Sequence, residues 1–417
     1  MLVYGINFTP EALGVGRYTG EMVAALKAAG HDVRVVTALP YYPEWRVAAG
    51  YRPWAYAFEQ RHGVPVARAP LWVPFRPGGR KRVLHLLSFA VSSLPLMARQ
   101  LFWRPDVVWL AAPAFVCAPA ALVAARLTGA KAWLHVQDWE SDKAFGMGLV
   151  SGSVWRALVQ GCERWLLRRF DHVSSISRAM VARAVAKGVA PERTSLVPNW
   201  ANVRGAWPAG KPTPYRAQLG LPSGAVVALY SGTMGVKQGV DWLAEVALRL
   251  EGHPRLHFVL CGEGALQAQT QALCSALPNV HFMPLQPLER LPELLALADV
   301  HLLPQRPGTA DMVMPSKLTG MLASGRPVVA MAALDGELAD VVQACGVVVP
   351  HGDVAAFAHA VQYLAERPEM CARLGETARA YAQDHLAADA VLARLEAQLR
   401  AVAGARVAAA AAENLAD

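Results

Sequence analysis

The sequence is poor in cysteine, and its cysteines are not spaced for metal binding or for disulfides. Only six occur in 417 residues, and no two of them form a CxxC pair. Single cysteines in mostly apolar surroundings pack as small hydrophobic side chains, so neither a zinc site nor a disulfide framework is expected. We therefore expect the chain to fold in a reducing compartment, the cytoplasm.

Long uninterrupted apolar runs are also missing. The run from Val83 to Met97 is broken by His85, three serines and Pro95, and it is shorter than the roughly 20 residues that span a bilayer. The first residues, MLVYGINFTP, contain no basic segment, which predicts that no secretory leader is present. The sequence thus predicts a chain without membrane-spanning helices.

Three signatures of nucleotide and metal enzymes are absent. No GxxxxGK[ST] sequence occurs, which excludes a P-loop. Gly14, Gly16 and Gly20 do not have the dehydrogenase spacing, and the expected second strand ends at Thr37 and not at an acid, so a dehydrogenase is disfavoured. No DxD pair flanks a suitable strand end, so we expect no required Mg²⁺, no other metal and no cofactor.

Acidic residues are scarce in the first half of the chain. Residues 1–200 hold 24 Lys and Arg against 12 Asp and Glu, whereas residues 201–417 hold 16 against 20. The basic first half predicts an anionic partner there, although basic loops can also serve solubility alone. The basic residues are mixed with bulky apolar ones and no nucleic-acid motif occurs, so nucleic acid is not the expected partner.

Hydrophobic residues are abundant, at 54% of the chain, and lie in short runs that alternate with helical patterns. This alternation predicts parallel sheets covered by helices, an α/β fold. The pattern restarts after a stretch rich in Pro and Gly, residues 199–222, so we expect two doubly wound, Rossmann-like domains. The expected strands are residues 2–7, 31–37, 106–111, 131–136 and 172–176 in the first domain, and 226–230, 256–261, 280–283, 300–303 and 327–330 in the second.

We place the first domain at residues 1–200, the second at 201–385, and a C-terminal helix and tail at 386–417. In open parallel sheets, ligands bind beyond the carboxyl ends of the strands. Two such domains facing each other would enclose a cleft, a common place for a ligand.

The first strand-to-helix loop contains Gly14, Val15 and Gly16. Glycines here let backbone amides approach a phosphate or a sugar at a helix N-terminus, although a plain tight turn would explain them too. The second domain opens in the same style with SGTMGVKQG, residues 231–239. Gly232 would expose backbone N–H groups there, and Lys237 supplies a charge suited to a diphosphate.

A third loop runs into MPSK, residues 314–317. Pro315 suits the first position of a helix, and Ser316 and Lys317 would then offer N–H groups and the positive end of the helix to a phosphate. An ordinary helix start explains Pro315 and Ser316, but it does not explain why three phosphate-friendly loops occur in one chain.

The motifs that carry a family resemblance stand in order from Met1 to about residue 385: YGINFTPEALGVGRYTGEM, TALPYYPEW, HVQDWESD, SLVPNWAN, SGTMGVKQG, CGEG and DMVMPSKLTGMLASGRPVV. Together they resemble the retaining glycosyltransferases of the GT-B fold, family 4-like group. More narrowly, they resemble the WcaI-type transferases of colanic acid and related exopolysaccharide assembly.

The resemblance implies roles for residues of the second domain. Lys237 would bind the diphosphate of a nucleotide-sugar donor, the backbone amides of Ser316 and Lys317 would hold its distal phosphate, and Glu263 would lie near the nucleotide. Members often carry two glutamates eight positions apart, where this chain has Met312 and Gly320. Asp311 is then the candidate to replace the first carboxylate.

A basic residue that often precedes the equivalent of Lys237 is also missing, since Thr233 or Met234 stands in its place. In the first domain the resemblance implies that Gly14, Val15 and Gly16 lie against the phosphate and the transferred sugar. His135 matches a histidine that touches the donor sugar, although a lone histidine at a strand end is often structural. Asp138 and Glu140 follow it.

Retention would let the donor's own phosphate oxygen take the proton of the acceptor hydroxyl. The protein must then stabilise the leaving diphosphate, which Lys237 and the amides at Ser316 and Lys317 would do without a metal. Closure of the two domains would exclude water and limit hydrolysis of the donor. The candidate catalytic residues are His135, Asp138 and Lys237.

The acceptor side is expected in the first domain. Tyr41, Tyr42 and Trp45 form a rigid aromatic loop that could stack on a sugar or simply pack. The basic cluster Arg80, Lys81 and Arg82 precedes an apolar, helix-like stretch that ends near Trp103.

Basic residues beside an apolar stretch with a Trp at its end suit a surface of anionic lipids, with a core helix as the alternative. The expected partners are a polyprenyl-diphosphate-linked saccharide and the cytoplasmic face of the inner membrane. Two other functions stay open, a GT-B-like nucleotide-sugar epimerase and a binding module without turnover. The resemblance favours fucose, or a deoxy or N-acetyl sugar.

Overall fold

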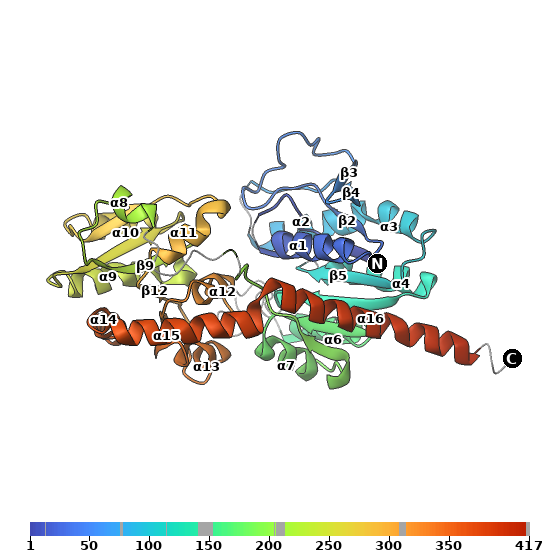
Figure 1. Ribbon diagram of the computed structural model, residues 1–417. Coiled ribbons are helices and arrows are strands. Elements are labelled where there is room, and N and C mark those ends of the chain that lie inside the picture. Colours follow the sequence, from blue (N-terminus) through green and yellow to red (C-terminus); the bar gives the residue numbers. More distant parts are fainter. Residues whose placement is uncertain are drawn as a thin grey trace. The chain divides into compact units, whose positions relative to one another are not determined.

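The computed structural model describes residues 1–12, 14–75, 78–113, 115–140, 153–203, 205, 213–307 and 314–413. The chain forms two compact units (Figure 1). One consists of Met1–Pro198 together with Leu392–Asp417, and the other of Asn199–Val391. The first unit thus consists of two separate segments of the sequence, with the second unit between them.

The first unit contains an eight-stranded sheet in the order β3-β4-β2-β1-β5-β6-β7-β8. All neighbouring strands are parallel except β3 and β4, which form an antiparallel hairpin. The strands are β1 (Leu2–Gly5), β2 (Arg34–Ala38), β3 (Ala57–Arg61), β4 (Val64–Ala69), β5 (Val107–Ala112), β6 (Lys131–Val136), β7 (His172–Ser175) and β8 (Thr194–Leu196).

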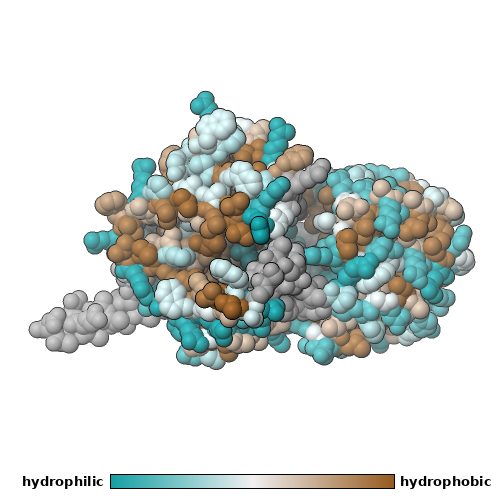
Figure 2. Space-filling view, turned by 180° about the vertical axis from the view of Figure 1, so that it is seen from behind, coloured by the Kyte–Doolittle hydropathy of each residue, from teal (hydrophilic) through white to brown (hydrophobic). Residues whose placement is uncertain are grey.

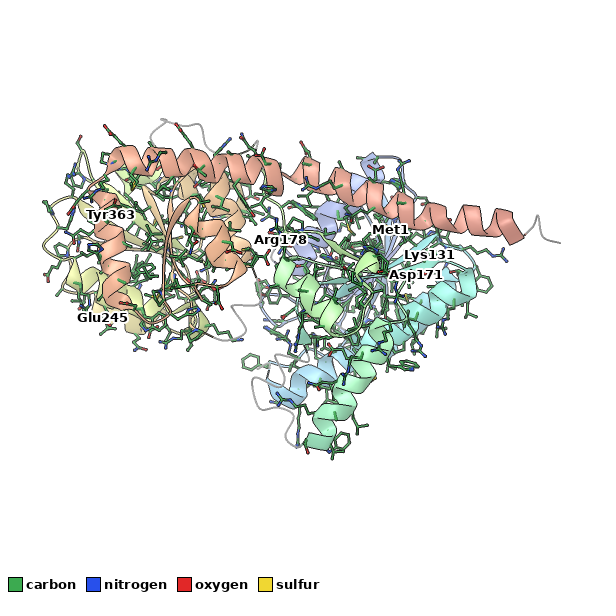
Figure 3. All side chains as sticks on the ribbon, turned by 90° about the horizontal axis from the view of Figure 1, so that it is seen from below. Met1, Lys131, Asp171, Arg178, Glu245 and Tyr363 are labelled. Atoms are coloured by element: carbon green, nitrogen blue, oxygen red, sulfur yellow. The ribbon has the colours of Figure 1, made fainter. Side chains whose placement is uncertain are left out.

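The central strands of this sheet are buried along their length, as expected for parallel strands covered on both faces. Their register is also fixed at the edge where the strands begin. Asp171, just before β7, accepts the N–H of Ala132 at 2.8 Å and pairs with Lys131 at 3.2 Å (Figure 3). The carboxylate therefore ties β6 to the start of β7.

Helices cover the first sheet: α1 (Gly14–Ala28), α2 (Gly79–Ser92), α3 (Leu94–Gln100), α4 (Ala118–Thr128), α6 (Ser153–Leu167), α7 (Arg178–Ala186), and short 3₁₀ turns η1 (Phe115–Cys117) and η2 (Pro191–Arg193). In α1 the residues Tyr18, Met22 and Leu26 are buried at a spacing of four, which is the core-facing stripe of an amphipathic helix.

The apolar, helix-like stretch expected before Trp103 does not form one continuous helix. It forms two helices, α2 and α3. Ser93 separates them, and Pro95 occupies the first turn of α3. Proline cannot donate the hydrogen bond that would continue α2. The hydroxyls of Ser93 and the buried Tyr4 are 2.6 Å apart, which anchors the break to β1.

The second unit contains a six-stranded, all-parallel sheet in the order β11-β10-β9-β12-β13-β14. Its strands are β9 (Val226–Ser231), β10 (Leu256–Cys261), β11 (Val280–Met283), β12 (Val300–Leu303), β13 (Val328–Met331) and β14 (Gly346–Val349). The expected fold class, two doubly wound parallel-sheet domains, is confirmed.

The helices of this unit are α8 (Pro214–Gln218), α9 (Val240–Arg249), α10 (Gln267–Leu273), α11 (Leu291–Ala296), α12 (Ser316–Ala323), α13 (Glu337–Gln343), α14 (Val354–Ala365) and α15 (Pro368–Tyr381), with 3₁₀ turns η3 (Val236–Gln238) and η4 (Leu288–Arg290) and a π turn η6 (Ala382–Leu386). Its main core lies between the sheet and helices α9 and α14.

The last helix, α16 (Ala388–Glu413), joins the first unit from Leu392 onward. Leu395 and Leu399 are buried there, and the Glu396 carboxylate lies 2.9 Å from the His31 ring. Within the described ranges, no helix has both the length and the apolar composition to cross a bilayer.

Candidate functional site

The site candidates of the second unit lie where its strand order reverses. Strand β9 has β10 on one side and β12 on the other, so the loops that follow β9 and β12 diverge. Such a switch point is where open α/β sheets bind ligands. The loop from Gly232 to Gly239 leaves β9 at this point and contains Lys237.

The loop after β9 is held by backbone bonds to the CGEG turn that follows β10. Met234 donates its N–H to the carbonyl of Glu263 at 2.8 Å, and Leu266 donates to the carbonyl of Met234 at 2.9 Å. A Cβ on Gly262 would lie 1.9 Å from the Gly232 oxygen, and one on Gly264 would lie 2.5 Å from the Met234 oxygen. Both glycines therefore let the two loops pack backbone against backbone.

Lys237 lies in η3 with its side chain exposed. Its carbonyl accepts the N–H of Arg306 at 3.1 Å. The Arg306 guanidinium pairs with Asp241 and lies 4.6 Å from the centre of the Trp242 ring. The chain after β12 thus braces the Lys237 turn from the other side of the switch point. Sequence reasoning missed Arg306, because no local pattern links it to Lys237.

The start of α12 differs by one position from the expectation. Pro315 is the N-cap residue, with an extended ψ of 124°, and the first helical residue is Ser316. Proline's fixed φ suits both positions. Ser316 and Lys317 lie in the first turn, as expected, where N–H groups have no partner within a helix.

The Lys317 side chain also reaches the loop after β9, which the sequence did not predict. Its ammonium donates to the Tyr230 hydroxyl at 3.2 Å and lies 4.3 Å from the centre of that ring. A Cβ on Gly232 would lie 3.6 Å from the same ammonium. Among the described residues no carboxylate pairs with it, and burial lowers the pKa of Lys317 to about 8. A second cation is therefore present at the switch point.

Two further donor-side candidates have different outcomes. Glu263 is exposed, and the structure shows its carbonyl, rather than its carboxylate, in contact with the loop after β9. Asp311 lies outside the described residues. The Cβ that Gly320 lacks would approach Leu295, so this glycine packs α12 on α11.

In the first unit, Gly14, Val15 and Gly16 begin α1 just beyond the end of β1. Gly14 is exposed with a φ of 56°, and its surroundings are open. Gly16 is buried, and a Cβ there would lie 2.9 Å from the Cβ of Glu11 and 3.0 Å from its Oε2. Gly16 thus makes room for a carboxylate of the protein itself, whereas Gly14 stays available to a ligand.

His135 lies near the end of β6 with its ring almost fully covered. Its Nδ1 is 2.9 Å from the Ser174 hydroxyl, which also accepts the Trp133 indole N–H at 2.8 Å. The ring stacks on Trp109 at 5.2 Å. Burial lowers the pKa of His135 to about 3, so we expect a neutral imidazole near pH 7, with one ring nitrogen as a donor and the other as an acceptor.

Asp138 follows β6 directly and is half-buried. The carboxylate of Glu140 accepts the N–H of Phe115 at 3.2 Å, which ties this loop to the one after β5. His135 and Asp138 are therefore brought to the same edge of the first sheet, the edge where its strands end.

The aromatic loop after β2 packs against α2. The Tyr41 ring lies 5.5 Å from Trp45 and 4.6 Å from His85, and Trp45 lies 5.3 Å from His85. Tyr42 is 39% exposed. Tyr41 and Trp45 thus form one cluster with His85, which the sequence analysis left without a role.

The structure does not bring Trp103 to the basic cluster. Arg80, Lys81 and Arg82 are exposed in the first turn of α2. The Trp103 indole donates to Asp32 at 3.2 Å and stacks on Arg34 at 4.4 Å, where β2 begins. Among the described residues no group of three His, Cys, Asp or Glu is placed to hold a metal ion.

A model of the "Glycosyl transferase 4-like domain" matches residues 14–200, and one of "Glycosyl transferases group 1" matches residues 225–367. The Escherichia coli K12 protein named putative colanic acid biosynthesis glycosyl transferase WcaI is 44% identical over 333 residues, covering 78% of this chain and 81% of the relative. This chain belongs to the WcaI-like glycosyltransferases. The resemblance stated from its motifs is confirmed.

Solved structures agree on the fold of this glycosyltransferase. Sucrose-phosphate synthase from Thermosynechococcus elongatus has a TM-score of 0.74 at 18% identity, covering 97% of this chain and 100% of that one. Anabaena HepE in complex with UDP and glucose has a TM-score of 0.68 at 16% identity, covering 96% and 100%. At these identities the likeness shows the GT-B fold alone.

Proposed function

We propose that this glycosyltransferase moves a sugar from a nucleotide-sugar donor onto a polyprenyl-diphosphate-linked saccharide, with retention at the anomeric carbon. The product would serve bacterial exopolysaccharide or O-antigen assembly; the name of the E. coli relative, a putative colanic acid biosynthesis glycosyl transferase, supports the first of these. The proposed transferred sugar is fucose, or another deoxy or N-acetyl sugar.

The observation that carries the proposal is the set of positive groups around one switch point of the second unit. Lys237 lies in the loop after β9, Lys317 extends to that loop from α12, and the N-terminus of α12 adds its unpaired amides. Such groups stabilise the charge of a leaving diphosphate. HepE was solved with UDP and glucose, which supports a nucleotide sugar as donor.

The same groups support a metal-independent reaction. A diphosphate that leaves with growing negative charge needs compensation, and two lysines with a helix N-terminus can supply it. We place no metal or cofactor in the site. His135, neutral and held by Ser174, is proposed to contact the donor sugar, and Asp138 is proposed to lie beside it.

The experiment that tests the proposal combines binding and turnover in EDTA. UDP-, GDP-, ADP- and dTDP-sugars are screened for thermal stabilisation, where a ligand at about 100 times its Kd adds roughly 2.7 kcal/mol. The stabilising donor is then incubated with a polyprenyl-diphosphate saccharide, and the anomeric configuration of the product is read by NMR. We expect transfer with retention.

Other outcomes identify the competing functions. Conversion of the donor to an isomeric nucleotide sugar without any acceptor would establish an epimerase. Stabilisation without consumption of any donor would point to a binding module. Transfer that EDTA abolishes and Mg²⁺ restores would contradict metal independence.

We also propose that the first unit docks on the cytoplasmic face of the inner membrane. In α2 only His85 and Phe89 are buried, whereas Val83, Leu84 and Leu87 are exposed. Helix α6 likewise exposes apolar side chains: Val154, Trp155, Leu158, Val159 and Trp165. Figure 2 shows hydrophobic residues gathered on this face of the first unit.

Charge supports a lipid partner for this face. Arg80, Lys81 and Arg82 occupy the first turn of α2, where the helix dipole is already positive and the turn itself contains no acid. Each cation at this end of a helix is unfavourable by a few tenths of a kcal/mol to about 1 kcal/mol. Anionic headgroups would relieve this repulsion while the apolar residues enter the interface.

Replacing Arg80, Lys81 and Arg82 together by glutamine is expected to weaken binding to phosphatidylglycerol-rich vesicles about 100-fold. Each basic residue near such a surface contributes about 1 kcal/mol. Co-sedimentation at several salt concentrations measures the effect, and neutral vesicles give the baseline. The matched control replaces Arg249, Arg367 and Arg373 of the second unit, and equal losses for both triple variants would contradict this docking face.

A further inference from the structure

Glu11 is a buried carboxylate that joins two loops of the first unit. Its Oε1 accepts the backbone N–H groups of Tyr41 and Tyr42, each at 3.0 Å. Its Oε2 accepts the side-chain N–H of Asn7 at 2.8 Å. The first loop runs from the end of β1 to α1, and the second is the aromatic loop after β2. One side chain therefore sets the distance between them.

A second buried charge spans the same two loops. Arg68, from β4, is fully buried and donates to the carbonyl of Ala38 at 2.9 Å and to the carbonyl of Thr9. It is also paired with Glu59 at 2.7 Å. Thr9 belongs to the first loop and Ala38 is the last residue of β2, so Arg68 ties the first loop to the strand from which the aromatic loop leaves.

Glu11 contacts both candidate ligand sites of the first unit, the glycine loop at the start of α1 and the aromatic loop after β2. On one side it fills the space above Gly16, at the start of α1, beside the exposed Gly14. On the other side its partner Tyr41 contacts Trp45 and His85. Asn7, which donates to Glu11, also donates to the Tyr41 hydroxyl at 3.3 Å.

Burying this carboxylate is costly, and an apolar side chain of the same size would pack with less desolvation. Burial accordingly raises the pKa of Glu11, against the hydrogen bonds and Arg68, which lower it. The three hydrogen bonds that the carboxylate accepts, together with the nearby charge of Arg68, offset this cost. Two of these bonds come from the backbone N–H groups of Tyr41 and Tyr42. The buried carboxylate therefore holds the backbone of the aromatic loop in one conformation.

We propose that Glu11 is a positioning residue, which locks the aromatic loop Tyr41–Trp45 to the loop before α1 and so orients the acceptor saccharide toward the transferred sugar. This inference rests on the proposed function, because it assigns the acceptor to the aromatic loop. It predicts that Glu11 affects use of the acceptor more than donor binding, since Glu11 bonds directly to the aromatic loop, whereas the diphosphate-binding candidates Lys237 and Lys317 belong to the other unit.

The test is Glu11→Gln, which keeps the shape and removes the charge. In the wild type, Oε2 of Glu11 accepts the side-chain N–H of Asn7. In the variant the glutamine NH₂ group takes the place of Oε2, so two N–H donors face each other. We expect the KM for the acceptor to rise about tenfold and the ratio of donor hydrolysis to transfer to rise by a similar factor. The Kd of the donor is expected to stay within about twofold of the wild-type value.

Rescue and control variants separate positioning from a general loss of structure. In Asn7→Asp/Glu11→Gln an acceptor faces the new N–H, so the acceptor KM is expected to return toward the wild-type value. Glu21→Gln removes a partly exposed acid of α1, paired with Arg17 in the same unit, and should change neither constant. The proposal would be overturned if Glu11→Gln raised the donor Kd and the acceptor KM by the same factor, or if it changed neither.

Hydrogen exchange tests the lock on the enzyme alone. The amides of Tyr41 and Tyr42 are expected to exchange about ten times faster in Glu11→Gln. Unchanged exchange would overturn the lock even if activity fell. A wild-type enzyme that transfers no sugar would count against the proposed function, whereas the exchange rates would still decide whether Glu11 holds the loop.

Discussion

Lys237→Ala is expected to lower kcat/KM for transfer by about 10²–10³-fold, the effect typical of removing one preorganised group that stabilises developing charge. The side chain is exposed at the switch point of the second sheet. The turn that carries it is held by the Arg306 N–H, so the substitution removes the charge without removing the turn. Initial rates at saturating acceptor measure the effect.

The matched control for Lys237→Ala is Arg249→Ala, which removes an exposed cation of the same unit that pairs with Glu245 within α9. Such exposed pairs contribute little, so its activity and melting temperature should match the wild type. If Lys237→Ala turned over near the wild-type rate, Lys237 would not be the residue that stabilises the leaving diphosphate. A variant with a lowered melting temperature would be judged by its folded fraction.

Lys317→Met is expected to weaken donor binding about 10–100-fold, because a hydrogen bond from a charged group contributes about 1.5–3 kcal/mol. Methionine keeps the length of the side chain against Tyr230 and removes the ammonium. Calorimetric titration with the stabilising nucleotide sugar measures the Kd. An unchanged Kd would show that α12 acts through its backbone amides alone.

Lys317 should also make donor binding depend on pH. With the pKa of Lys317 lowered to about 8 by burial, the free enzyme loses this charge above that pH. A bound diphosphate favours the charged form, so binding takes up a proton there and the Kd should rise with pH, by up to about tenfold per unit. Titrations from neutral pH upward in two buffers measure this, and Lys317→Met should abolish the proton uptake.

The stability of the free enzyme should change in the opposite direction. The pKa of Lys317 is lowered in the folded state from 10.5 to about 8. Between these values the unfolded chain binds the proton and the folded chain does not, so this group makes the free energy of unfolding rise with pH. The melting temperature difference between wild type and Lys317→Met should therefore shift in favour of the wild type across this range.

Local patterns predicted the strands that are buried throughout. The run KAWLHV matches β6 residue for residue, because a strand covered on both faces reads as a continuous apolar run. The hairpin β3–β4 was missed. Glu59 lies in one of its strands and the fully buried Arg68 in the other, and their ion pair places charge where a hydrophobic pattern expects none.

The residues of the candidate site also fall into two groups, those that local patterns predict and those that depend on distant partners. Lys237, Ser316 and Lys317 could be predicted because glycines and helix starts mark phosphate loops within a few residues of sequence. Glu11 and Arg306 could not, since their partners are supplied by other loops of the folded units. Gly16 shows the limit most clearly, because its missing side chain makes room for Glu11.

The return of α16 to the first unit has a consequence for how this enzyme is made. Residues 1–198 leave the ribosome before the second unit, yet Leu395 and Leu399, which belong to the first unit, are synthesised only after it. The apolar surface that these leucines cover must wait for them throughout translation of the second unit. A fragment that ends near residue 198 would keep this surface exposed permanently, and we expect chaperones to engage the nascent first unit until α16 emerges.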